Sequence, residues 1–183
     1  MAENGHLKTL KIPLLLAFWS VIFVLPLWFS IGRNSVADTY WESAFRFWNG
    51  QNPYARGVVG DIYQYSPLFA FLYGPFVWLS PTFQSIVWGF INAFVFWWGM
   101  CRWCRFEWRM SGWLWAAWIL AAMELDISLR YHQINALLTG SILIALDLYR
   151  RNALASSAFV LALGTNIKIL PIVFAGALVW PLK

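Results

Sequence analysis

Side chains of this sequence that can transfer protons or bind anions are few, and they gather in a small number of places. Carboxylates, imidazoles and basic groups are the usual proton carriers and anion ligands of protein sites. The acidic residues Asp38, Glu42, Asp61, Glu124 and Asp126 lie between apolar runs, and the polar string Arg130, Tyr131, His132, Gln133 and Asn135 follows the last two. Any site of this chain should therefore be sought among these residues.

Motifs for several common chemistries are missing from the sequence. There is no glycine-rich phosphate loop, no serine–histidine–aspartate arrangement and no dense carboxylate cluster of the kind that holds a metal ion. Cys101 and Cys104 form a C-x-x-C pair, but a zinc site needs two further ligands near by, and the sequence offers none. We therefore expect no metal site, assign the cysteines a structural role, and find the pattern unlike that of a nucleotide-driven pump.

The elements that position these residues are apolar helices. Of the 183 residues, 61% are hydrophobic, 20% aromatic and only 11% charged, whereas about a quarter of an ordinary soluble domain is charged. Apolar runs recur along the whole chain, and a helix needs about 20 residues to cross a bilayer. This composition predicts an all-α, polytopic transmembrane bundle in a single domain over residues 1–183. The net charge of +5 comes from small basic groups between apolar runs, so we exclude nucleic acid as a partner.

The order of the spans follows from the charges that flank them. Lys8 and Lys11 precede the apolar run 12–31, which is longer than the core of a secretory signal and predicts an uncleaved first span. Residues 32–81 then form an external loop, in which the short run 67–79 is a re-entrant or interfacial helix. Five further spans are predicted over residues 82–103, 112–128, 135–149, 153–167 and 169–180.

This topology places the chain in the plasma membrane with a cytoplasmic N-terminus. The cytoplasmic basic residues are Lys8, Lys11, Arg102, Arg105, Arg109, Arg150, Arg151 and Lys183, against Arg33, Arg46, Arg56, Arg130 and Lys168 outside. Most acidic residues then lie on the external or periplasmic side, so we expect the chemistry there. Several spans are short, and polar groups at their outer ends must line a shared cavity rather than face lipid. Asp147 is instead expected to pair with Arg150 and Arg151 at the cytoplasmic end.

The external loop begins with an amphipathic stretch over residues 38–48. Tyr40, Ala44, Phe47 and Trp48 fall on one helical face, and Asp38, Glu42 and Arg46 recur at four-residue spacing on another. Asn49-Gly50 is a typical helix end, and Pro53 prevents any continuation. The pattern predicts a helix that lies at the membrane interface.

At this point the sequence resembles a known family. The acid before Tyr40-Trp41, the run from Asn49 to Tyr54 and the run from Tyr63 to Pro67 resemble the first external loop of polyprenyl-phosphate-sugar-dependent glycosyltransferases of the C-type fold. The narrower likeness is to glycosyltransferase family 87, which includes bacterial alpha-mannosyltransferases. His132 to Asn135 is similar to that family's Gly-Gln-x-Asn element, with His132 in place of the glycine, and Lys168 to Pro171 is similar to its Lys-x-x-Pro element. The family's length implies that this chain corresponds to the N-terminal half of a longer enzyme.

The resemblance implies transfer of a hexose, mannose being expected, from a polyprenyl-phosphate sugar to an external lipid or glycan acceptor. In this interpretation Asp38 is the base that accepts the proton of the attacking hydroxyl, with Glu42 and Asp61 as alternatives, and Lys168 holds the departing phosphate. The sugar and phosphate ligands implied are His132, Gln133, Asn135 and Arg130, together with the tyrosines Tyr54, Tyr63 and Tyr65. No cofactor is implied, and nothing in the sequence indicates a divalent ion.

The same residues also allow structural interpretations. Asp38 can be a solvated residue of an amphipathic helix, and Lys168 can anchor the end of a span at the interface. His132 can be an ordinary loop residue, and Gln133 and Asn135 can form hydrogen bonds between helices. A non-catalytic membrane protein, either a transporter fragment or a scaffold subunit, is the alternative function. Transporters commonly contain repeated halves, and no internal repeat is found here, so the enzyme is favoured.

Overall fold

The computed structural model describes residues 28, 36–56, 63–104, 112–168 and 171–172. Within these residues every regular element is a helix and there is no strand, as predicted for an all-α chain. In chain order the elements are α2 (Val36–Trp48), α3 (Pro67–Tyr73), the 3-10 helix η1 (Gly74–Trp78), α4 (Pro81–Cys104), α5 (Gly112–Arg130), α6 (Asn135–Arg150) and α7 (Leu154–Ile167). The predicted spans 12–31 and 169–180 lie outside the described residues, apart from Trp28, Pro171 and Ile172.

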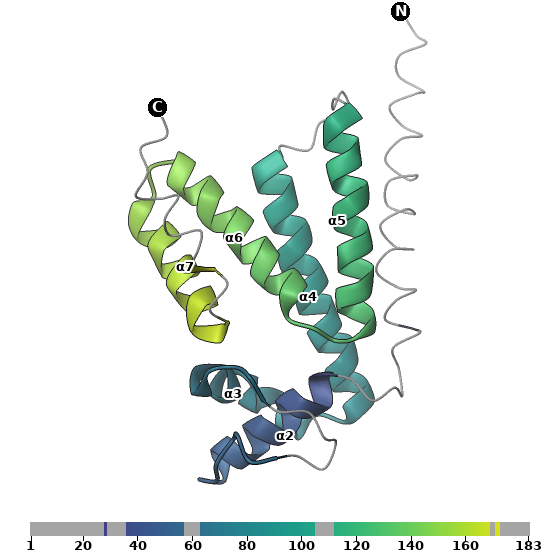
Figure 1. The fold of residues 1–183 in the computed structure, drawn as a ribbon, viewed down its shortest axis with the longest axis vertical. Helices are drawn as coiled ribbons and strands as arrows, with labels where there is room; N and C mark the ends of the chain where they lie inside the picture. Colours follow the sequence, from purple (N-terminus) through teal and green to yellow (C-terminus); the bar gives the residue numbers. More distant parts are fainter. Residues whose placement is uncertain (1–27, 29–35, 57–62, 105–111, 169–170, 173–183) are drawn as a thin grey trace, which may run out of the picture.

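The helices form two groups (Figure 1). The long helices α4, α5, α6 and α7 make a bundle, and α2, α3 and η1 lie together across one end of it. The four long helices coincide with the four predicted spans that fall on described residues, to within two residues at each end. None of the helices in the described segments has both the length and the mean hydropathy that crossing a membrane requires.

Helix α2 ends where the sequence predicts. Gly50 has a φ of 69°, a left-handed conformation that glycine adopts without steric cost, and it closes the helix after Trp48. Asp38 in the first turn and Arg46 in the last turn complement the helix dipole. The buried face contains Tyr40 and Ala44, as predicted, but Trp48 at the end of the helix is 55% exposed although it packs on Phe71 of α3.

The segment predicted as a re-entrant helix forms two short helices beside α2. Ser66 caps α3, accepting a hydrogen bond from the Phe69 backbone N–H at 3.4 Å, and Pro67 takes the first position, where no donor is needed. The Trp48 indole stacks on Phe71 with ring centroids 5.2 Å apart, and it lies where a side chain on Gly74 would be. Glycine at this position therefore lets α2 and η1 approach closely.

Helices α4 and α6 cross at two glycines. A Cβ atom on Gly99 would lie 2.8 Å from the Gly140 Cα, and one on Gly140 would lie 2.6 Å from the Phe96 Cα. Both distances are shorter than real side chains tolerate, so only glycine allows the two backbones to meet. The crossing fixes the direction in which α6 leaves the loop at residues 131–134 and so positions the polar residues at its start.

Candidate functional site

The loop that joins α5 to α6 is the centre of the candidate site, and hydrogen bonds from three helices hold it. The Tyr131 carbonyl accepts from the Val36 N–H at 3.3 Å, which ties the start of α2 to the loop. The His132 carbonyl accepts from the Trp88 indole N–H of α4 at 2.9 Å, and the Gln133 carbonyl accepts from the Ser128 hydroxyl of α5 at 3.1 Å. The loop is therefore fixed to α2, α4 and α5 together.

A chain of polar groups runs from this loop to the end of α7. The Lys168 Nζ donates to Asn135 Oδ1 at 3.1 Å, and Asn135 Nδ2 donates to Gln133 Oε1 at 2.8 Å. Lys168 is half-buried, and no carboxylate of the described residues forms an ion pair with it. The ammonium charge thus stands at the edge of the loop with an amide oxygen as its neighbour, which is a suitable environment for an anionic ligand.

Asp38 and His132 lie near each other at the same end of the bundle. Asp38 is half-buried in the first turn of α2, two residues after the Val36 that bonds to the loop. Burial lowers the pKa of His132, and the negative charge of Asp38 raises it in part, so the carboxylate acts on the imidazole through space. Burial also raises the pKa of Tyr73, and Asp38 adds to that rise. The Asp38 carboxylate is therefore near enough to affect both Tyr73 of α3 and His132 of the loop electrostatically.

His132 is the most unusual residue of the loop. It has a φ of 52° and is only 2% exposed, and neither ring nitrogen has a hydrogen-bond partner among the described residues. A buried polar group without a partner costs roughly 1–3 kcal/mol. Since burial favours the neutral imidazole, the ring offers one donor and one acceptor to a ligand.

The three predicted tyrosines occupy different environments around α2 and α3. Tyr63 is 4% exposed and its hydroxyl donates to the Ser66 carbonyl at 2.9 Å, so its ring belongs to the core. Tyr65 is half-buried, and its hydroxyl accepts from the Tyr40 hydroxyl at 2.9 Å. Tyr54 is 44% exposed and donates to the Tyr65 carbonyl at 3.1 Å. Of the three, Tyr54 presents the largest accessible surface to a ligand.

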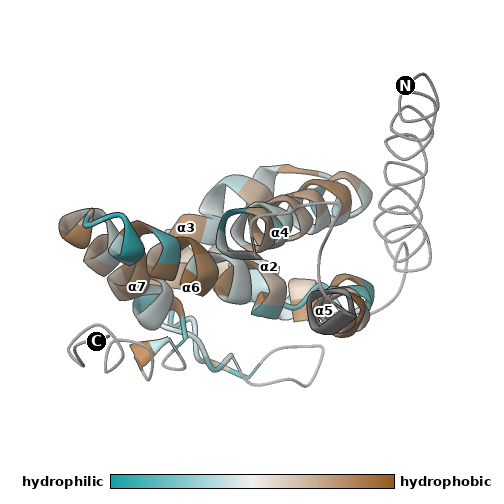
Figure 2. Cartoon of the chain, turned by 90° about the horizontal axis from the view of Figure 1, so that it is seen from above, coloured by the Kyte–Doolittle hydropathy of each residue, from teal (hydrophilic) through white to brown (hydrophobic). Residues whose placement is uncertain are grey.

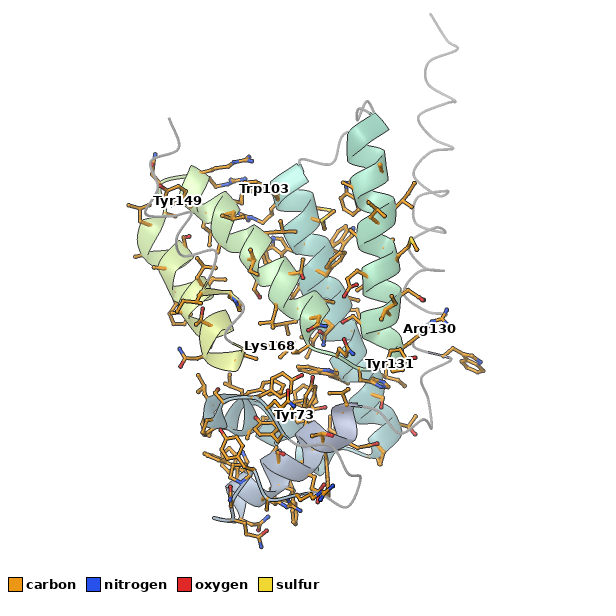
Figure 3. The ribbon with its side chains drawn as sticks, in the orientation of Figure 1. Tyr73, Trp103, Arg130, Tyr131, Tyr149 and Lys168 are labelled. Carbon is orange, nitrogen blue, oxygen red and sulfur yellow. The ribbon has the colours of Figure 1, made fainter. Side chains whose placement is uncertain are left out.

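Two other predicted residues are engaged elsewhere. Arg130 forms an ion pair with Asp126 at 2.8 Å on the outside of α5, well apart from Lys168 (Figure 3). Glu42 forms an ion pair with Arg46 at 2.6 Å, one turn further along α2 than Asp38. The third acidic candidate, Asp61, lies outside the described residues.

The opposite end of the bundle carries a separate basic cluster. Asp147 is 1% exposed, and its Oδ2 lies 2.8 Å from Nε of Arg102 and 2.9 Å from Nε of Arg151. The expected pairing of Asp147 is confirmed for Arg151 and wrong for Arg150, whose guanidinium lies over the Trp103 ring, 4.6 Å from its centroid. Arg150 follows Asp147 by three residues, but its side chain points toward Trp103 of α4. Arg102 of α4 forms the second ion pair with Asp147 instead.

Several contributors to the site were not found from the sequence. Trp88 and Asn92 of α4 hold the loop and the first turn of α6, and Asn92 Oδ1 accepts from the Leu137 N–H at 3.2 Å. Gln84 donates to the Tyr73 hydroxyl at 2.8 Å beside them. These polar residues repeat at four-residue spacing inside an apolar helix, which is the signal that could have identified them. The C-x-x-C cysteine Cys101 packs beside the core near Met100, and no group of three metal-ligating residues occurs in the described part of the chain.

Three segments bring a carboxylate, an imidazole and an ammonium group to one end of an all-helical bundle, where they could act as a proton acceptor and as ligands of an anion. The chain belongs to glycosyltransferase family 87, whose family model matches residues 63–181. It is also 32% identical over 136 residues to GPI mannosyltransferase 1 of Gibberella zeae, a match that covers 72% of this chain and 30% of that protein. The chain thus matches less than a third of its curated relative's length. No solved structure matches the chain.

Proposed function

We propose that this chain carries the donor-binding and base-containing part of a membrane-embedded mannosyltransferase. The proposed reaction moves mannose from a polyprenyl-phosphate sugar to an external lipid or glycan acceptor. The observation that carries the proposal is the meeting of three distant segments, α2 with Asp38, the loop with His132 to Asn135, and the end of α7 with Lys168. Membership of glycosyltransferase family 87 and the mannosyltransferase name of the Gibberella zeae relative support it.

The polytopic membrane placement is part of the proposal, and exposed apolar side chains support it. On α4 they recur at helical spacing along one face, as Phe83, Ile86, Phe90, Phe94 and Trp97, each at least 38% exposed. Hydrophobic residues predominate along α4, α6 and α7, and hydrophilic residues gather at helix ends and connections (Figure 2). A continuous apolar face of this length suits a lipid environment rather than water. The acidic end with Asp38 then faces the exterior and the basic end with Arg151 the cytoplasm.

The proposed chemistry assigns one task to each charged group. The acceptor hydroxyl oxygen attacks the anomeric carbon, and the bond between that carbon and the phosphate oxygen breaks. Asp38 takes the hydroxyl proton, and the polyprenyl phosphate leaves with the bonding electrons. Lys168 stabilises the negative charge that develops on the phosphate, while Gln133 and Asn135 orient Lys168 and the sugar. His132 donates to or accepts from the bound donor, which satisfies its buried ring.

The substitution Asp38→Asn tests the assignment of the base. The amide keeps the size of the side chain and cannot accept the proton, so we expect transfer to fall by a factor of about 10²–10⁴. The measurement is the transfer of radiolabelled mannose from polyprenyl-phosphate mannose. The assay uses membranes from cells that express the variant from its whole reading frame. Glu42→Gln is the matched control, since Glu42 lies one turn away and is held by Arg46.

The substitutions Lys168→Met and Lys168→Arg test the phosphate ligand in the same assay. Lys168→Met removes the charge and should weaken donor use by about tenfold or more, because a charge-assisted hydrogen bond contributes roughly 1.5–3 kcal/mol. Lys168→Arg keeps the charge and should retain most of the activity. Full transfer by both Asp38→Asn and Lys168→Met, at normal protein levels, would reject the proposed site.

A further inference from the structure

The basic cluster at the end of the bundle opposite Asp38 takes no part in the proposed transfer. It comprises Arg102 at the end of α4, Arg150 and Arg151 at the end of α6, and the buried Asp147 between them. Among the described residues of this cluster, two guanidinium groups contact the single carboxylate and the third lies over Trp103, which gives a surplus of two positive charges there. A structural ion pair requires only one arginine, so the additional positive charges can serve a further role besides orienting the chain in the membrane.

The geometry of the cluster leaves its strongest donors available. Arg102 and Arg151 both use Nε toward the same oxygen, Asp147 Oδ2. The terminal nitrogens of the three arginines donate no hydrogen bond to another described residue. Arg150 and Arg151 are exposed, and the ion pair with the buried Asp147 orients the Arg151 side chain. A planar guanidinium with free terminal N–H groups binds a phosphate through two parallel hydrogen bonds.

The surroundings of the cluster are those of a lipid rather than a soluble anion. Trp103 lies under Arg150, and Trp103 and Tyr149 lie at the same end of the bundle (Figure 3). Trp98, one turn before Arg102, is 44% exposed, and Leu154, three residues after Arg151, is 57% exposed. Amphipathic rings beside basic groups, with apolar surface directly adjoining, match the head group, glycerol region and acyl chains of a phospholipid.

We propose that Arg102, Arg150 and Arg151 form a binding site for the phosphate of an anionic glycerophospholipid on the cytoplasmic leaflet. This inference rests on the membrane placement in the proposed function but not on sugar transfer. Asp147 is a positioning residue, because it fixes two guanidiniums without neutralising the third. The bound lipid would hold the ends of α4 and α6 together at the side opposite the transfer site.

Native mass spectrometry of the detergent-purified chain tests the proposal without any sugar donor. The probes are dioleoyl phosphatidylglycerol, dioleoyl phosphatidylcholine and inorganic phosphate. We expect preferential retention of phosphatidylglycerol and about a fivefold weaker affinity when Arg150→Gln removes one charge, since each basic residue near an anionic membrane surface contributes about that factor. Arg150→Gln/Arg151→Gln should weaken it about 25-fold by the same factor for each charge. Arg130→Gln, at the other end of the bundle, is the control and should leave retention unchanged.

Three results would overturn the proposal. They are equal retention of the two lipids, an equal loss with Arg130→Gln, and competition by inorganic phosphate at the concentration of the lipid, which would identify a site for free phosphate. Arg150 makes no ion pair with Asp147, so we expect Arg150→Gln to keep the fold. The single variant therefore tests lipid binding even if the double variant does not fold. Since lipid retention and mannose transfer are separate measurements, failure of one does not imply failure of the other.

Discussion

Among single residues, His132 combines three features that are each unfavourable for the stability of the folded chain. Its backbone is left-handed, its side chain is buried, and its ring nitrogens have no partner among the described residues. A non-glycine residue in this conformation is uncommon, and such outliers gather where structure serves a function. The similar element of the family has glycine here, which adopts the conformation freely. The imidazole is therefore unfavourable in the loop by itself, and a hydrogen bond from a bound sugar donor would offset that cost.

The stability of the chain should depend on pH through His132. Burial lowers the pKa of His132 below its ordinary value of 6.5, so on acidification the unfolded chain binds the proton first. The contribution of the neutral ring is complete above about pH 6.5 and is lost progressively below it. We expect His132→Asn, which tolerates the left-handed backbone, to reduce the fall in melting temperature between about pH 7.5 and 5.5.

The matched control for this measurement is His6→Asn, which removes the other of the two histidines. We expect that variant to keep the part of the decline in melting temperature that His132 contributes. An unaltered decline in His132→Asn would show that the imidazole is protonated equally in the folded and unfolded chain, and would remove the argument for a neutral ring in the site.

At the scale of helices, the glycine crossing of α4 and α6 determines the shape of the site. Gly140→Ala places a methyl group against the Phe96 Cα and the Val95 carbonyl, where backbone rather than a movable side chain must give way. Such overpacking typically costs about 1–3 kcal/mol. The expected result is a lower midpoint of thermal unfolding in detergent, compared with Ser141→Ala at the next position. A midpoint equal to that of Ser141→Ala would mean that the helices do not meet here.

The limits of the helices could be predicted because local chemistry sets them. Pro67 begins α3 and Gly50 closes α2 by backbone effects that act within a few residues. The partner of Asp147 could not be predicted, since it depends on how α4 crosses α6 through a glycine 41 positions away from Gly140 in the sequence. Tyr63 was expected to contact a ligand, but packing of α3 on α2 buries it.

The candidate site shows the same division between local and distant effects. Asp38, His132 and Lys168 were predicted from motif order, and the structure brings their segments to one end of the bundle. Arg130 was predicted from its place beside His132 in sequence, yet the helix turns it toward Asp126. Trp88, Asn92 and Gln84 were not found because their four-residue spacing indicates one shared helix face but not which loop that face contacts.

At the scale of the whole molecule, the two ends of the bundle differ in charge. Among the described residues, Asp38 and Glu42 lie with Arg46 and Lys168 at one end, whereas Arg102, Arg150 and Arg151 outnumber Asp147 at the other. Charge asymmetry of this kind orients membrane proteins with the basic end inside. The proposed topology is therefore testable by asking from which side each end can be reached.

Single cysteines at exposed positions supply that test. In a background with Cys101→Ala and Cys104→Ala, we expect Gln51→Cys to react with an impermeant maleimide applied to intact cells. Asn152→Cys should react only after the membrane is opened, since the residue lies at the basic end. Labelling of both positions in intact cells would contradict the proposed orientation.

The hydrogen bond from the Lys168 ammonium to Asn135 has a consequence for biosynthesis. Asp38 and His132 are translated well before Lys168, and α7 must pack on α6 before the ammonium reaches the loop. A nascent chain that has inserted only as far as α6 thus holds its acid and imidazole without the cation opposite them. If Lys168 binds a phosphate as proposed, the loop therefore gains that ligand only after α7 has been made and has packed on α6.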